Sequence, residues 1–183
     1  MTARIGESYR PSMDLKKRKM QRKREKSEMC GIFAYLNYDV NIERRYILQV
    51  LFNGLRHLEY QVYDSTGIPI DHSYSFNPNT PQSSPLHPLI FRQKGNIETL
   101  VKSVYQEVAE TYLNLEESFS LHVGIAHTRW ATHGEPAPRN SHPQSSGFGN
   151  EFLVFHNGVI TNYEALKESL VRHEFTFESE TDT

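Results

Sequence analysis

The chain has 183 residues, of which 37% are hydrophobic and 23% are charged, a composition that excludes a collagen-like or wholly disordered protein and fits about one globular domain. Its single cysteine, Cys30, excludes a disulfide framework or a cysteine-rich zinc module, because both require several thiols. No apolar run is long enough to cross a bilayer. We therefore expect a cytoplasmic protein without a membrane partner.

The net charge of −2 conceals a basic arm at residues 1–28, which holds ten of the 20 Lys and Arg but four of the 22 Asp and Glu. Like charges repel along its run from Leu15 to Lys26, so we expect a disordered extension. Basic clusters also serve as nuclear-localisation or nucleic-acid-binding segments, which makes the nucleus the alternative location. The run contains no aromatic residue for base stacking, which disfavours a nucleic-acid partner.

The folded domain is predicted to begin at Met29. The apolar stretch from Cys30 to Leu36 predicts a buried strand, and a helix over 42–58 follows, with Asn41 as its N-cap. The helix prediction rests on apolar residues that recur every three or four positions: Ile47, Val50, Leu51, Leu55 and Leu58.

The middle of the domain contains a short predicted strand over 67–70. Pro69 confines that strand to a sheet edge, because proline has no N–H to donate to a second ladder. Residues 72–88 are rich in proline and serine and predict a loop. A second helix is expected over about 97–113, with Asn96 as its N-cap.

The last third is predicted to continue with a strand over 123–127, a loop over 128–150 and a strand over 152–155. A capping box formed by Thr161 and Glu164 predicts a helix that ends near Arg172. Phe175 and Phe177 predict one further strand. The mixture of strands and long helices indicates an α+β protein.

Cys30 directly follows Met29 at the start of the folded domain. An isolated cysteine is more often an inert buried thiol than a nucleophile. In a chain that began at Met29, removal of the methionine would place the thiol beside its own free amine. An amine with a pKa of about 8 is a suitable base for activating a thiol.

Six motifs occur along the chain: Met29-Cys-Gly-Ile-Phe-Ala-Tyr35, Leu58-Glu-Tyr60 with Tyr63-Asp-Ser65, His127-Thr-Arg-Trp-Ala-Thr-His-Gly-Glu135, Ser141-His-Pro-Gln144, His156-Asn-Gly158 with Thr161-Asn-Tyr163, and Glu178-Ser-Glu-Thr-Asp-Thr183. Together, and in this order, they resemble the glutaminase domain of the glutamine:fructose-6-phosphate aminotransferases, which are class II glutamine amidotransferases. Other class II amidotransferases share the opening Cys-Gly-Ile but not this set.

The resemblance implies the N-terminal-nucleophile hydrolase fold, a four-layer sandwich of two antiparallel sheets between helices. Residues 29–183 would form part of that domain, incomplete at the C-terminus, and the sugar isomerase domains would be absent. Fructose-6-phosphate would then be a partner only through those absent domains. In the family, the released ammonia serves synthesis of glucosamine-6-phosphate and UDP-N-acetylglucosamine.

The resemblance also implies how glutamine is hydrolysed. Cys30 would attack the side-chain amide to form a thioester, and the Asn157 side chain with the Gly158 N–H would stabilise the oxyanion. Arg129 would bind the substrate α-carboxylate and Asp182 its α-ammonium group. The pocket would be lined by Trp130, Thr132 and His133. No metal ion or cofactor is expected.

Four features depart from the family. Residues precede Cys30 in this sequence, so the nitrogen of Cys30 belongs to an amide. Gln61 and Val62 stand where the family has an Arg-Gly pair, and Pro69 interrupts a predicted strand. The sequence also ends before the family's glutaminase domain does. These departures favour an alternative in which the chain is a catalytically inactive remnant. Such a remnant would associate with a second copy or with a full-length relative.

Overall fold

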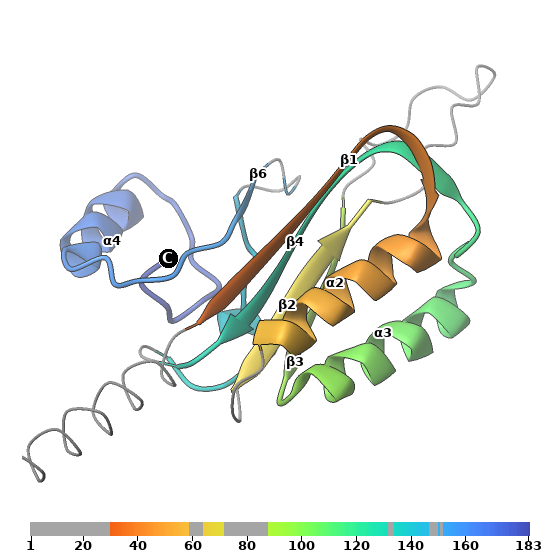
Figure 1. Cartoon of the computed structure of the whole chain (residues 1–183). Coiled ribbons are helices and arrows are strands. Elements are labelled where there is room, and N and C mark those ends of the chain that lie inside the picture. The colour runs from red at the N-terminus through yellow and green to blue at the C-terminus, as the bar shows by residue number, and fades with distance from the viewer. Residues whose placement is uncertain (1–29, 59–63, 72–87, 132–133, 147–149, 151) are drawn as a thin grey trace, which may run out of the picture.

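The computed structural model describes residues 30–58, 64–71, 88–131, 134–146, 150 and 152–183 (Figure 1). The predictions on residues 1–28, on Gln61 and Val62, and on almost all of the loop at 72–88 lie outside these ranges. Along the chain the elements are β1 (Gly31–Glu43), α2 (Arg44–Leu58), β2 (Ser65–Ile70), β3 (Leu89–Lys94), α3 (Ile97–Thr111), β4 (Ser118–Arg129), a 3-10 turn (Pro138–Asn140), β5 (Gln144–Ser146), β6 (Phe152–Val154) and α4 (Tyr163–Arg172).

A four-stranded antiparallel sheet with the order β1-β4-β2-β3 forms the main body of the structure. The helices α2 and α3 lie side by side on one face of this sheet (Figure 1). The strands β5 and β6 pair in a second, two-stranded antiparallel sheet. The predicted α+β class is therefore confirmed.

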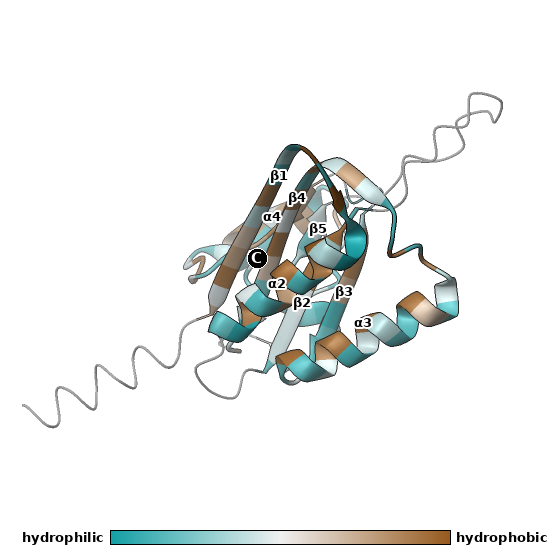
Figure 2. Cartoon of the chain, turned by 45° about the vertical axis from the view of Figure 1, so that its right-hand side comes forward, coloured by the Kyte–Doolittle hydropathy of each residue, from teal (hydrophilic) through white to brown (hydrophobic). Residues whose placement is uncertain are grey.

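The hydrophobic core lies between the helices and the main sheet. Each helix turns one apolar stripe toward the strands, as the three- and four-residue spacing predicts, and the brown stripes of α2 and α3 are visible in Figure 2. The fully buried core side chains include Leu48, Leu51 and Leu55 of α2, Leu100 and Val104 of α3, and Ile68 and Ala126 of the sheet.

The opposite face of β1 and β4 exposes an apolar row of side chains, which we call the open sheet face. Leu36 and Tyr38 of β1 are 66% and 76% exposed, and Leu121 and Val123 of β4 are 55% and 61% exposed. Side chains on a strand alternate between faces, so the same strands that fill the core also build this second apolar face.

The predicted helix over 97–113 is confirmed as α3, and Asn96 is its N-cap. The Asn96 side chain accepts a hydrogen bond from the Thr99 N–H at 3.0 Å. The prediction for α2 is wrong at its start: Asn41 lies in β1, and the helix begins at Arg44. Pairing of β1 with β4 continues to Glu43, so the strand ladder takes the residues that local spacing assigned to the helix.

Pro69 lies inside β2 without ending it. All six residues of β2 are buried, and Pro69 pairs with Ile90 of β3. The pairing between β2 and β4 ends at Gly67, two residues before the proline. The predicted edge position is therefore wrong, because β2 lies between β4 and β3 in the sheet. The missing N–H of Pro69 does not interrupt the strand, because Pro69 itself has a partner strand on one side only.

Three predictions for the last third are wrong. The predicted loop over 128–150 contains the end of β4 and all of β5. In α4 the N-cap is Asn162, which makes no capping hydrogen bond with its side chain, so the predicted capping box is not formed. Phe175 and Phe177 lie outside any strand and are 59% and 42% exposed, because no described strand is placed to pair with them.

Gly67 allows the loop that contains His142 to pack against the main sheet. A Cβ atom added at Gly67 would collide with the His142 carbonyl oxygen, which is backbone and has little freedom to move away. We expect the Gly67→Ala variant to lose about 1–3 kcal/mol of unfolding free energy, as overpacked core variants do. Urea unfolding would measure the loss. The control is Ser120→Ala, at an exposed strand position, which should change the unfolding free energy by less than about 0.5 kcal/mol. Equal stability of the two variants would contradict this close approach.

Candidate active site

Cys30 lies at the edge where β1 begins and β4 ends. Antiparallel pairing places Gly31 opposite Thr128, and the Thr128 hydroxyl accepts the Gly31 N–H at 3.0 Å. The Trp130 N–H donates to the Cys30 Sγ at 3.2 Å. The strand register therefore fixes the half-buried thiol next to the residues that follow β4.

Asn157 reaches the same point from the turn after β6. Its Nδ2 donates to the Cys30 carbonyl at 2.7 Å, and its Oδ1 lies 2.9 Å from the Nε2 of His127. Burial lowers the pKa of His127 to about 3, so the ring is neutral and its Nε2–H is the donor to Asn157. The imidazole thus orients the amide, and the amide keeps a second N–H for another acceptor.

Arg129 ends β4 and is a buried residue, 4% exposed. The guanidinium donates to the carbonyls of Gly134 at 3.2 Å and Glu135 at 3.3 Å. Burial lowers the arginine pKa, and the nearby Asp64 and Asp182 act in the opposite direction. Two carboxylates therefore lie close enough to Arg129 to interact with its positive charge.

Asp182 belongs to the C-terminal segment, which packs against the turn at residues 156–160. Its Oδ2 accepts the Ile160 N–H at 2.6 Å, and the Nδ1 of His156 lies 3.2 Å from the Thr183 hydroxyl. Gly158 in this turn has a φ of 151°, and a Cβ there would lie 2.9 Å from the His156 ring. The positive φ is the reason that the turn needs glycine at this position, since the end of a side chain such as His156 can move aside.

The described surroundings of the thiol raise its pKa and do not lower it. Burial raises the pKa of Cys30, and the Trp130 N–H and the positive charge of Arg129 offset only part of that increase. His127 is neutral and its Nε2 is engaged by Asn157. Activation of this thiol at neutral pH therefore requires a base other than His127.

The described part of the chain contains neither a cluster of metal-ligating side chains nor a helix that could span a membrane. No three His, Cys, Asp or Glu side chains gather there in a way that could hold a metal ion. None of the helices described has the length and apolarity of a membrane span.

Over most of its length the chain is similar to glutamine–fructose-6-phosphate aminotransferases of several organisms. No family model matches the chain. Over 155 residues, which are 85% of the chain, it is 71% identical to glutamine–fructose-6-phosphate aminotransferase (isomerizing) 1 of Arabidopsis thaliana. The chain is homologous to these aminotransferases. The identity is 48% to the enzyme of Rattus norvegicus and 43% to that of Saccharomyces cerevisiae, also over 155 residues.

The homology concerns only a part of these aminotransferases. The chain spans 22% of the length of the Arabidopsis and rat enzymes and 20% of the yeast enzyme.

The structure places the described residues that the motifs predict as a site close to one another, since the positive charge of Arg129 also acts on Cys30. Cys30, Trp130 and Asn157 are joined by hydrogen bonds, and Arg129 and Asp182 interact electrostatically. The predicted pocket residues Thr132 and His133 lie outside the described residues. The structure assigns no catalytic role to any of these side chains, and their roles remain predictions.

Sequence reasoning did not single out three supporting residues. His127 orients Asn157, Thr128 holds the backbone after the thiol, and Asp64 accepts the Ala131 N–H at 2.6 Å. All three lie inside motifs that carry the family resemblance, which was the available signal. Their contacts join residues far apart in sequence, so spacing alone could not reveal them.

Proposed function

We propose that the chain forms part of a glutaminase domain and that Cys30 is its nucleophile. The observation that carries this proposal is the hydrogen bond from the Asn157 amide to the backbone carbonyl of Cys30, a residue 127 positions away, at one edge of the sheet. Arg129 and Asp182 add opposite charges nearby. This set matches the two ends of glutamine, an amide at one end and an α-amino acid group at the other.

In the proposed reaction, the Cys30 sulfur attacks the side-chain amide carbon of glutamine, and the thiol proton passes to a base. The carbonyl oxygen gains negative charge, which the second N–H of Asn157 and the Gly158 N–H would stabilise. The C–N bond then breaks, and ammonia leaves with the transferred proton. Water cleaves the resulting thioester to glutamate and restores the thiol.

The α-amino acid end of glutamine would be held by two charged groups. Arg129 would donate to the α-carboxylate, for which the planar guanidinium is well suited, and Asp182 would accept from the α-ammonium group. Trp130, Thr132 and His133 would line the rest of the pocket. This arrangement would select an amino acid over a simple amide.

We also propose the N-terminal-nucleophile sandwich as the finer description of the fold. The open sheet face supports it, because a second sheet packed there would bury Leu36, Tyr38, Leu121 and Val123 between two sheets. Residues 1–28 would be an extension, and 29–183 part of the domain. Fructose-6-phosphate would be handled by the part of the relatives that the chain does not match.

Assay of ammonia release tests the proposed glutaminase activity. A chain that begins at Cys30 is expected to release ammonia from glutamine, and its Cys30→Ala variant is expected to release none, because the thioester cannot form. Isothermal titration with glutamine should still detect binding to the variant, since Arg129 and Asp182 are unchanged. If the chain that begins at Cys30, without substitutions, released no ammonia at saturating glutamine, the proposal would be refuted.

A second candidate function is association without catalysis, with a second copy of the chain or a longer relative as the partner. The specific observation in its favour is the open sheet face, since exposed apolar patches mark interaction surfaces. A chain that keeps its fold but neither binds nor hydrolyses glutamine would support this candidate.

A further inference from the structure

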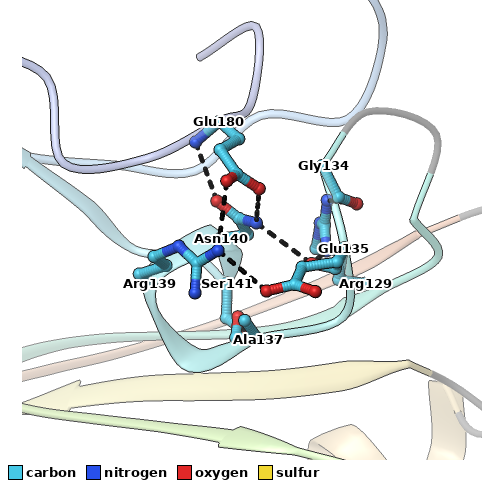
Figure 3. Close-up of polar contacts among 8 residues, drawn as sticks. All are labelled: Arg129, Gly134, Glu135, Ala137, Arg139, Asn140, Ser141 and Glu180. Atoms are coloured by element: carbon cyan, nitrogen blue, oxygen red, sulfur yellow. Dashed lines mark hydrogen bonds and ion pairs between the residues drawn. The ribbon is translucent and has the colours of Figure 1, made fainter.

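Asn140 is a fully buried amide that joins two separate segments of the chain (Figure 3). Its Nδ2 donates to the Glu135 carbonyl at 3.0 Å and to the Glu180 carboxylate at 3.1 Å. Its Oδ1 accepts the Glu180 N–H at 2.8 Å. A single side chain therefore satisfies backbone groups on both segments.

The first segment positions Arg129. The Glu135 carbonyl that accepts from Asn140 also accepts from the Arg129 guanidinium at 3.3 Å. Gly134, the neighbouring guanidinium acceptor, has a φ of 71°, and a Cβ at this residue would lie 2.9 Å from the Asn140 Nδ2. Gly134 and Glu135 are thus held between the arginine and the buried amide.

The second segment positions Asp182. Glu180 lies two residues before it, and its backbone N–H is held by Asn140. The Asp182 carboxylate is held in turn by the Ile160 N–H at 2.6 Å. Displacement of Glu180 would therefore move the carboxylate relative to the arginine.

Arg139 forms a parallel but exposed link. It contacts the Glu135 carboxylate at 2.8 Å and the Glu180 carboxylate at 3.1 Å, and the three side chains are 47%, 63% and 55% exposed. Ion pairs at such exposure contribute little, because solvent screens them. The buried hydrogen bonds of Asn140 are the stronger link between the two segments.

We infer that Asn140 is a positioning residue that sets the spacing between the Arg129 guanidinium and the Asp182 carboxylate, and thereby determines specificity for an α-amino acid. This inference rests on the proposed function, in which these two groups bind the α-carboxylate and the α-ammonium group of glutamine. A ligand that engages both groups depends on their spacing. A ligand that engages Arg129 alone does not.

Glutaramate distinguishes these two cases, because it is glutamine without the α-amino group. Isothermal titration of the full 183-residue chain would measure both ligands, directly for glutamine and by competition for glutaramate. We expect Asn140→Ala to weaken glutamine binding about tenfold or more, which is about 1.4 kcal/mol. Glutaramate binding should change by less than about threefold.

The exposed residue Glu180 provides a second variant that does not empty a buried site. Glu180→Ala removes the carboxylate from Asn140 and should weaken glutamine binding in the same direction, by a smaller factor. Arg139→Ala removes only the exposed link and should change it less than about twofold. Glu98→Ala, which breaks an exposed ion pair with Arg56 between α2 and α3, is the matched control.

The outcomes separate this inference from the proposed function. If the unmodified chain does not bind glutamine, the proposed function fails, and the inference fails with it. Suppose that the unmodified chain binds glutamine. If the Asn140→Ala variant then binds glutamine equally well, or if its affinities for glutamine and glutaramate fall by the same factor, only the positioning role is refuted. Should Asn140→Ala not fold, unchanged glutamine binding by Glu180→Ala would refute that role.

Discussion

A chain that begins at Cys30 is expected to hydrolyse glutamine about 10²–10⁴ times faster than the 183-residue chain, the range that general-base catalysis contributes. In the shorter chain, the nitrogen of Cys30 is a free amine that accepts the thiol proton. In the longer chain the same nitrogen is an amide, which is not basic at neutral pH. Glutamate formation at saturating glutamine would measure both rates.

The structure explains why this effect should be large. Burial raises the pKa of the Cys30 thiol, so the reactive thiolate is scarce at neutral pH without a base. His127 is neutral, with a pKa of about 3, and donates to Asn157. The α-amine is the base that remains in the proposed mechanism.

A matched control separates the effect of the free amine on the rate from the effect of removing the basic arm. A chain with one alanine added before Cys30 lacks residues 1–29 but carries an acylated nitrogen. It should be as slow as the 183-residue chain. Equal rates for this control and the chain that begins at Cys30 would show that the amine has no role as the base.

Replacement of Asn157 by alanine is expected to lower kcat by about 10²–10³, the usual cost of removing one oxyanion donor. The Asn157 Nδ2 lies beside the nucleophile, 2.7 Å from the Cys30 carbonyl, and its second N–H is the proposed oxyanion donor. Steady-state kinetics with glutamine, in the chain that begins at Cys30, would measure the loss. Asn157→Asp should behave similarly, because a carboxylate cannot donate.

Alkylation of Cys30 by iodoacetamide controls for damage to the nucleophile in the Asn157 variants. The thiol keeps its Trp130 N–H contact when the amide is removed, so the alkylation rate should change little. A loss of less than tenfold in kcat with unchanged alkylation would argue that Asn157 is not an oxyanion donor. A large loss of alkylation would instead place its effect on the thiol.

Local sequence determined the features that depend on neighbouring residues. The apolar spacing and Asn96 specified α3 and its first turn, because a cap and an amphipathic stripe act over only a few residues. The motifs around Cys30, Arg129 and Asn157 indicated the family, since each motif is a short run of neighbouring residues. The class of the fold followed from the same patterns.

Tertiary structure alone decided where strands end and which residues meet. Pairing with β4 extended β1 through Asn41. Phe177 lies outside any strand and has no described partner strand. Both outcomes depend on a second strand, which local propensity does not supply. The approach of Cys30 to Asn157 and the burial of Asn140 also depend on contacts across the folded chain. Such contacts arise from packing, so the spacing of residues in the sequence does not predict them.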